Sequence, residues 1–182
     1  MAPLLILIVL LIGSWLIYRQ SQTTRNSTGI AETPQQRSGP ADIYPDPART
    51  PGATNPEITQ DNIEETICNP RWTTRSIRPS SQYANRLKME QIREYGYSDF
   101  SRKDYEEDHF IPLELGGNPT DPRNLWPEPF ETSIPDGGAH YKDKVENYLH
   151  AEVCAGSLTL QQAQQEITQD WYRVYATSVP HR

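Results

Sequence analysis

The distribution of apolar and polar residues divides the chain into three regions. Residues 2–18 are almost entirely apolar, and the first charged side chain after them is Arg19. Residues 20–60 are rich in Ser, Thr, Gln, Asn and Pro and contain few apolar residues. From Asp61 onward, aromatic and aliphatic residues recur regularly. The pattern therefore predicts an N-terminal membrane segment over residues 1–19, a flexible linker over residues 20–60 and one folded domain over residues 61–182.

The N-terminal segment has the length of a short membrane anchor. Its uncharged stretch lies at the border between a spanning helix of about 17–25 residues and a signal-peptide core of about 7–15 residues. No A-x-A-like cleavage site follows it, and Trp15 and Tyr18 have the character of interfacial aromatics. We therefore favour an uncleaved anchor over a cleaved signal. Arg19 and Arg25 favour a cytoplasmic domain, because positive charges stay inside.

Three stretches of the domain have the spacing of helices. Residues 82–95 follow two serines and end before Gly96, which is the punctuation of a capped helix. Residues 139–153 carry apolar side chains at helical spacing. A third helix starts after Ser157 or Thr159 and runs through Tyr175, with a regular apolar stripe at Leu160, Ala163, Ile167, Trp171 and Val174. We expect Trp126 and Trp171 to lie in the core.

Between the first two helices the pattern changes to that of a hairpin. Residues 109–115 and 123–128 are extended runs, and a cluster of turn residues over 116–122 separates them. Pro112 and Pro127 limit both strands to edge or irregular positions. The fold class predicted is α+β, with a β-hairpin and a following helix as the core and additional helices flanking it.

Charge and cysteine content narrow the classes of function. The chain has a formal net charge of −7, and residues 61–182, with 13 basic and 20 acidic side chains, carry all of it. Such a domain lacks the basic footprint of a general polyanion binder.

Two cysteines exclude a four-cysteine zinc site. Cys68 and Cys154 bracket the domain, either as two unrelated buried thiols or as a disulfide, and we favour the disulfide. Closing a loop of this size stabilises a fold by about 4–5 kcal/mol in the entropy model. A disulfide in turn favours the non-cytoplasmic side of the membrane, against the arginines.

One constellation of residues carries the chemistry. Asp108 and His109 precede an apolar run that ends in Gly116-Gly117, Asn124-Leu125 follows, and His140 opens the next helix. Over about residues 105–145 this order resembles the HNH endonucleases, of the ββα-metal type. A wider similarity to small exported bacterial HNH proteins spans residues 68–171, and it rests on Cys68, Arg78-Pro79, Lys88, Gly96-Tyr97, Leu125-Trp126-Pro127-Glu128, Lys142-Asp143, Cys154 and Asp170-Trp171.

The resemblance implies a metal-dependent nuclease, and the residue types suit that chemistry. A hard divalent cation such as Mg²⁺ or Mn²⁺, held by Asp108 and His140, neutralises charge on the reacting phosphate. An imidazole without a metal takes a proton from water, which makes His109 the general base. The family role of the asparagine, bracing the hairpin and orienting the base, falls to Asn124. The substrate expected is nucleic acid, with DNA favoured and RNA left open, and the products carry 5′-phosphate and 3′-hydroxyl ends.

Three basic residues are the candidates for binding the substrate phosphates. Arg123 lies in the second extended run, and Lys142 and Lys144 lie near the first turn of the helix. Free amides of that turn also favour an anion. The alternative for both lysines is a solvated helix face. Glu106 and Glu107 directly precede Asp108 and are candidates to extend or tune the metal site.

Several features depart from the family pattern. The two Cys-x-x-Cys pairs that bind a structural zinc in many HNH domains are absent from the sequence. The gap between Asn124 and His140 is longer than usual, which leaves His150 as a competitor for the third position. These two histidines are about 280° apart around one helix, so they cannot both face one metal. Asp108 and His109 also point to opposite faces of a regular strand, so the metal site requires a distorted strand or a metal at its edge.

The sequence therefore predicts a membrane-anchored or secreted HNH-type endonuclease on the non-cytoplasmic side. The alternative is a non-catalytic anchored module on the same fold, which binds a protein or cell-envelope ligand. A third possibility is a structural domain whose hairpin closes a metal-free core. With so acidic a domain, we expect nucleic-acid binding to be weak and sensitive to salt.

Overall fold

The computed structural model describes residues 41–180 of the chain. The predicted membrane segment over residues 1–19, the first part of the predicted linker and His181 lie outside these residues. Among the residues described, no helix is both long enough and apolar enough to cross a bilayer.

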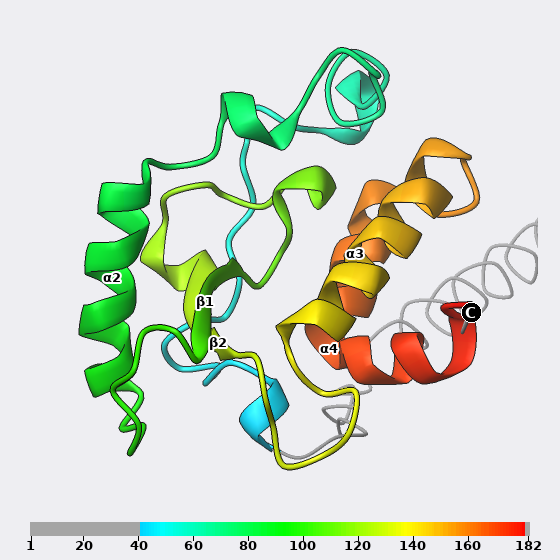
Figure 1. The fold of residues 1–182 in the computed structure, drawn as a ribbon. Helices are drawn as coiled ribbons and strands as arrows, with labels where there is room; N and C mark the ends of the chain where they lie inside the picture. The colour runs from blue at the N-terminus through cyan, green and yellow to red at the C-terminus, as the bar shows by residue number, and fades with distance from the viewer. Residues whose placement is uncertain (1–40, 181–182) are drawn as a thin grey trace, which may run out of the picture. The chain divides into compact units, whose positions relative to one another are not determined.

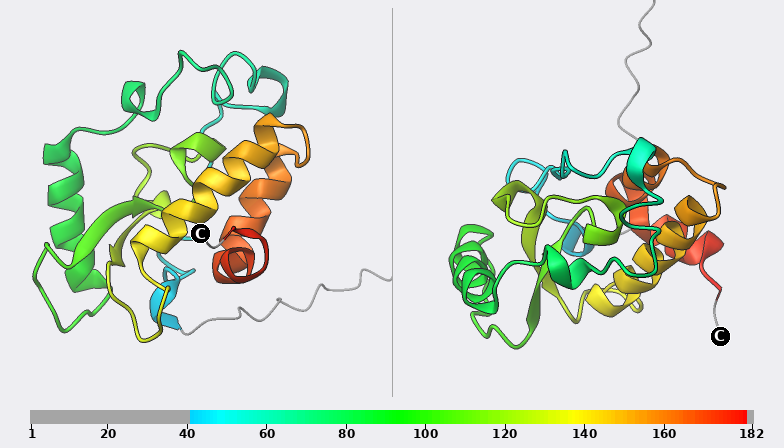
Figure 2. Two further views of the ribbon diagram at one scale, coloured as in Figure 1. Left: turned by 45° about the vertical axis from the view of Figure 1, so that its right-hand side comes forward. Right: turned by 90° about the horizontal axis from the view of Figure 1, so that it is seen from above.

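The described residues form an α+β fold around one antiparallel hairpin, as the sequence predicts. The strands are β1 (Tyr105–His109) and β2 (Leu125–Pro129). The helices are α2 (Ser81–Glu94), α3 (Ala139–Cys154) and α4 (Leu160–Ser178), with short 3-10 turns η1 (Ala41–Ile43), η2 (Gln60–Asn62), η3 (Thr74–Ser76), η4 (Leu113–Leu115) and η5 (Pro122–Asn124). The hairpin lies between α2 on one side and the α3–α4 pair on the other (Figures 1 and 2).

Helix α2 matches the prediction to within one residue at each end. The Ser80 hydroxyl accepts a hydrogen bond from the Tyr83 amide at 3.3 Å, which caps the first turn. Gly96 follows the helix with φ of 71°, a left-handed conformation that favours glycine. The inner face of α2 reaches the hairpin, because Gln91 Nε2 donates to the Leu125 carbonyl at 2.8 Å.

The hairpin occurs at the predicted place, but its first strand is shifted. The predicted strand over residues 109–115 is wrong, because β1 ends at His109. Pro112 has no amide proton to donate to a ladder, and the residues after it fold into η4. Leu113 and Leu115 are buried there, so the apolar run forms a 3-10 turn packed into the core and not a strand. The second strand also starts later, at Leu125, because η5 occupies the preceding residues.

Helices α3 and α4 form the larger part of the core. The Thr159 hydroxyl accepts from the Gln162 amide at 3.2 Å and fixes the start of α4. The predicted stripe of α4 is buried as a whole, at Leu160, Ala163, Ile167, Trp171 and Val174. Trp126 of β2 is fully buried too, so both tryptophans are core residues as predicted.

Residues 41–60, which the sequence pattern assigns to the linker, pack against the domain. Ile43 is fully buried, and its carbonyl accepts from Trp171 Nε1 at 2.9 Å. The Gly52 amide donates to the Arg123 carbonyl at 2.9 Å, and the Asn55 amide donates to the Gly116 carbonyl at 2.8 Å. These bonds use backbone groups, which a polar composition does not reveal. The packed domain therefore begins before Asp61.

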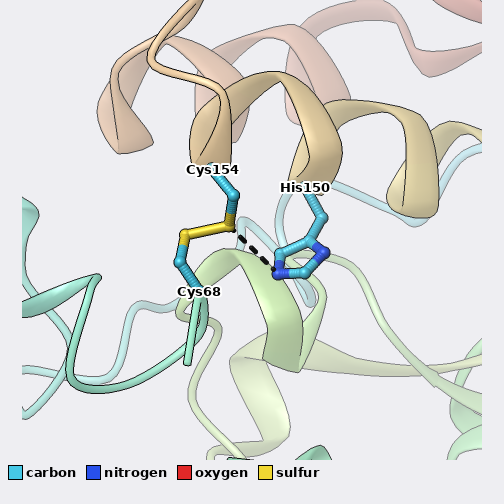
Figure 3. A group of neighbouring side chains, drawn as sticks. All are labelled: Cys68, His150 and Cys154. Carbon is cyan, nitrogen blue, oxygen red and sulfur yellow. Dashed lines mark hydrogen bonds between the residues drawn. A yellow bond between two sulfur atoms is a disulfide. The ribbon is translucent and has the colours of Figure 1, made fainter. Parts of the chain in front are cut away.

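The predicted disulfide between Cys68 and Cys154 is present. It joins the segment before η3 to the last residue of α3 (Figure 3). No cysteine is free. Because disulfides persist in oxidising surroundings, the bond indicates an extracellular or otherwise oxidising location.

Candidate active site

The two faces of strand β1 separate Asp108 from His109. The ladder pairs Asp108 with Trp126 and His109 with Leu125 without interruption, so the strand keeps its pleat. Asp108 contacts helix α3, whereas His109 lines a cleft together with residues of α2. The distortion that a shared metal site would require is therefore not present in β1.

On the α3 side, Asp108 belongs to a buried cluster of charged groups around Lys142. Lys142 Nζ lies 2.5 Å from Asp108 Oδ2 and 2.5 Å from Glu146 Oε1, and it donates to the His109 carbonyl at 3.1 Å. Glu128 of β2 contributes a third carboxyl group, whose Oε2 lies 3.9 Å from Lys142 Nζ. Lys142 is fully buried, so it does not lie on a solvated helix face.

Burial and the single cation set the charges of this cluster. Burial disfavours the charged forms of both Asp108 and Lys142. At Asp108 this effect is overcome by the Lys142 ammonium, with a hydrogen bond from Glu128 and the nearby His109, and the pKa of that carboxyl is lowered. The surrounding carboxylates likewise outweigh burial at Lys142 and raise its pKa well above the ordinary value. Burial raises the pKa of Glu146 to about 8 and that of Glu128 well above its ordinary value. Near neutral pH the cluster is therefore a salt bridge between Asp108 and Lys142 beside two carboxyl groups that favour their protonated forms.

The residues predicted to hold the metal do not fit a divalent ion in this arrangement. The carboxylate of Asp108 is paired with the Lys142 ammonium group. The pair has no net charge and therefore little attraction for a cation. His140 is 72% exposed, with Nδ1 3.9 Å from Asp143 and its ring 5.2 Å from that of Phe130. The carboxyl groups around Lys142 do not converge closely enough to form a set of ligands among the described residues.

His150 is placed away from this cluster and next to the disulfide. Its Nε2 lies 2.8 Å from the Ile67 carbonyl and 3.5 Å from Cys154 Sγ (Figure 3). Cys68, His150 and Cys154 are the one group of three metal-ligating side chains that converge within the described residues. The two sulfurs are bonded to each other, so this group is a disulfide with a neighbouring histidine and gives no evidence of a metal.

On the α2 side, the imidazole of His109 is held in one orientation. Nε2 lies 3.0 Å from the Pro119 carbonyl, which can only accept a hydrogen bond, so Nε2 carries the proton. Nδ1 is then the nitrogen with a free lone pair in the neutral ring. Burial lowers the pKa of His109, an effect that Asp108 partly offsets, and so the neutral ring is favoured. This is the state that a general base needs.

Asn124 braces the loop that positions His109. Its Oδ1 accepts from the Ile111 amide at 2.9 Å, and its Nδ2 donates to the carbonyls of Ile111 and Asn118 at 3.0 Å each. Asn118 precedes Pro119, whose carbonyl holds the His109 ring. Asn124 is fully buried, and its side chain ties Ile111 to Asn118 across the loop.

The Gly-Gly pair of the motif has a steric explanation in the same loop. A Cβ atom on Gly117 would lie 1.7 Å from the Ile111 carbonyl oxygen and 2.8 Å from Asn124 Nδ2. Gly116 has φ of 72°, which closes η4 in a left-handed conformation. A larger residue at position 117 would displace the Asn124 amide that braces the loop.

A cleft of about 590 Å³ lies between helix α2 and strand β1, with His109 in its wall. Its lining includes four basic residues: Arg78, Lys88, Arg102 and Lys103. Of these, Arg78 and Lys88 contribute to the family resemblance but have no predicted role in a site, and Arg102 and Lys103 have no predicted role. The dipeptide Arg102-Lys103 just before β1 is a visible sign of local positive charge in the sequence. Hydrophobic periodicity does not show that this loop borders a cleft, so the sign could not be placed at a site.

The basic residues predicted to bind phosphate already have partners. Arg123 is bound to Asp121, with Nη2 2.6 Å from Oδ2. Lys144 lies over the ring of Tyr141, with Nζ 4.4 Å from the centroid. Lys142 is buried in the cluster with Asp108. The structure therefore does not bring these three residues together with His109 at one surface.

The two glutamates before Asp108 differ in their surroundings. Both oxygen atoms of Glu107 are buried and form no hydrogen bond with another described residue. Burial raises the pKa of Glu107 to about 8, although Lys88 acts against it. Burial also raises the pKa of Glu106, and the nearby Asp108 adds to the effect. Both residues line the cleft beside His109.

Comparisons with models of protein families, with curated proteins and with solved structures find no match to this chain.

Proposed function

We propose that this chain is an HNH-type endonuclease that hydrolyses phosphodiester bonds of nucleic acid with His109 as the general base. The observation that carries the proposal is the geometry at His109. The ring lines a cleft, Nε2 is committed to the Pro119 carbonyl, and Nδ1 is left as a base. The resemblance to HNH endonucleases in the order Asp108-His109, Gly116-Gly117 and Asn124 supports the same assignment.

In the reaction, a water molecule in the cleft gives one proton to His109 Nδ1 while its oxygen attacks phosphorus. The bond between phosphorus and the 3′ oxygen breaks, and that oxygen takes a proton from solvent. The products are a 5′-phosphate and a 3′-hydroxyl end. Asn124 acts as a positioning residue, because it holds the loop whose Pro119 carbonyl orients the base.

The predicted dependence on Mg²⁺ or Mn²⁺ is a separate part of the proposal. Because Asp108 is engaged by Lys142, no step above is assigned to a metal. Cleavage assays with chelator, Mg²⁺ and Mn²⁺ decide whether a divalent ion takes part.

The test is cleavage of plasmid DNA and of RNA by the full chain and by His109→Gln. Glutamine can keep a donor to the Pro119 carbonyl but offers no base of similar strength. We expect cleavage by the wild type and a loss of at least about 100-fold in the variant. His150→Ala is the control, since this histidine lies at the disulfide, and we expect it to retain activity. Equal rates, or an equal lack of cleavage, for wild type and His109→Gln across metals and salt would refute the proposal.

A second candidate is a non-catalytic binding module on the same fold. The salt bridge between Lys142 and Asp108 favours it, because this bridge occupies the carboxylate that a catalytic metal would use. Such a module would retain its ligand affinity in His109→Gln and would show no cleavage under any condition.

We also propose that the domain acts on the non-cytoplasmic side of a membrane, either anchored by residues 1–19 or secreted. The disulfide supports an oxidising location. Protease accessibility of the domain in intact cells tests the orientation, and N-terminal sequencing of the mature protein separates a retained anchor from a cleaved signal.

A further inference from the structure

We propose that the cleft between helix α2 and strand β1 binds the phosphodiester backbone of the substrate through Arg78, Arg102 and Lys103. This inference rests on the proposed function for the identity of the ligand. It moves the substrate-binding surface from α3, where the sequence places it, to the opposite side of the hairpin.

The cations of the cleft are available to a ligand. Arg78, Arg102 and Lys103 are exposed, and their charged groups form no hydrogen bond or close ion pair with another of the described residues, although Arg78 acts at longer range on Glu106 and Asp143. In contrast, Arg123 and Lys142 are each bound to a carboxylate, and Lys144 is engaged with aromatic rings. A cation without a partner gains more from a phosphate than one that must first leave a carboxylate.

The loop that carries Arg102 and Lys103 is held in place by helix α2. Lys88 of α2 donates to the Arg102 carbonyl at 3.1 Å and to the Tyr105 carbonyl at 2.8 Å. The loop is thereby tied to the helix at the edge of the cleft. The backbone that carries two cations of the His109 cleft is thus held before any ligand arrives, which reduces the ordering cost of binding.

Negative charge in the cleft is confined to the strand. The acidic residues in its lining are Glu106 and Glu107, both on the strand. The oxygen atoms of Glu107 are buried, and Glu106 is only half-buried. The charged residues of the lining that are exposed, Arg78, Arg102 and Lys103, are thus positive, although the chain as a whole has a net charge of −7. Local attraction in an acidic protein predicts weak binding with a strong dependence on salt.

The shape of the site favours a nucleic-acid strand over an anionic lipid surface. The three cations border a recess of about 590 Å³ with a histidine in its wall. A single strand of phosphates can enter such a recess, whereas a flat bilayer surface meets only protruding side chains.

The experiment compares two double variants of the full chain, each of which removes one arginine and one lysine. Arg102→Gln/Lys103→Gln removes charges of the cleft, and Arg123→Gln/Lys144→Gln removes the same charges on the surface predicted from the sequence. Binding of a fluorescein-labelled DNA duplex is measured by anisotropy in EDTA, between about 20 and 200 mM salt. Each lost phosphate contact lowers the slope of log K against log salt by about 0.9.

We expect the cleft variant to bind at least about 10-fold more weakly, with a slope smaller by about 1–2, and the other variant to bind as the wild type does. Adding Arg78→Gln should weaken binding further. An equal loss in both double variants, or a loss only in the second, overturns the inference. So does binding that occurs only to vesicles of phosphatidylglycerol. Binding is measured without cleavage. If the cleft variant loses DNA affinity but the wild type cleaves no nucleic acid, the proposed function is refuted and the proposed binding site is retained.

Discussion

Replacing Lys142 by methionine tests the buried charge cluster directly. Methionine fills a similar volume without charge, so Asp108 and Glu146 are left without their cation. Their side chains are only 14% and 15% exposed, so water cannot replace the ammonium. Breaking a buried ion pair in this way costs about 3–5 kcal/mol, and we expect the free energy of unfolding to fall by that amount at pH 7.

The geometry supports a loss of this size. Asp108 Oδ2 and Glu146 Oε1 each lie 2.5 Å from Lys142 Nζ, so they are at most about 5 Å apart. Near pH 7 the Glu146 carboxyl favours its protonated form, so the charge left without a cation is that of Asp108; once Glu146 ionises at higher pH, two unit negative charges at that separation repel by about 3 kcal/mol at an effective dielectric constant of about 20. The variant escapes the repulsion only by protonating a carboxyl group, so we expect the loss to grow as the pH rises.

The assay is urea denaturation of the full chain with its disulfide intact, followed by tryptophan fluorescence, because Trp126 and Trp171 are fully buried. Lys144→Met is the matched control: its ammonium lies over the exposed side of α3, where a cation–π contact contributes about 0.5–1 kcal/mol. The double variant Asp108→Asn/Lys142→Met should be more stable than Lys142→Met, since it leaves no unpaired charge. The reasoning fails if Lys142→Met costs no more than Lys144→Met, or if the second substitution brings no recovery.

Three further predictions follow from the fold. The pair Cys68→Ser/Cys154→Ser should lose about 4–5 kcal/mol of stability in urea titrations, because the unfolded chain regains the freedom of a loop of 86 residues; a loss below about 1 kcal/mol would contradict this. Burial raises the pKa of Glu107 to about 8, so the contribution of this residue to stability is complete below about pH 4.5 and is lost as the pH rises to 8. In thermal melts, the melting temperature of Glu107→Gln should therefore fall less over this pH range than that of the wild type. An equal fall in both proteins would refute the prediction. Asn124→Ala should lower stability by at least about 2 kcal/mol and lower nuclease activity further than stability explains, because the loop that orients His109 loses its brace; full activity in the folded variant would exclude the positioning role.

The helices could be predicted because their signals are local. The serine before α2, the threonine before α4 and the stripe that ends at Val174 all act within a few residues of one another. The position of the first strand could not be predicted in the same way. An apolar run of six residues suits both a strand and a buried 3-10 turn, and packing against α3 and α4 decided for the turn.

The candidate site was predicted in part. His109 and Asn124 have the surroundings expected of a base and a brace, because the motif contains the whole loop that joins them. The pairing of Asp108 with Lys142 was not predicted, since the two residues are 34 positions apart and meet only through the packing of α3 on the hairpin. The cations of the cleft were missed because they come from two loops that flank α2, and no sequence pattern relates those loops to β1.

The disulfide also has a topological consequence for the site. Together with the backbone between Cys68 and Cys154 it forms a covalent ring, and α2, both strands and nearly all of α3 lie within it. Every residue assigned here to the base, its brace and the cleft belongs to this ring. A protease that cuts one exposed loop of the ring, such as the loop before β1, opens the backbone but releases no fragment. In surroundings rich in proteases, a nicked molecule would keep its two pieces joined, so cleavage of one bond would not separate the residues of the proposed site.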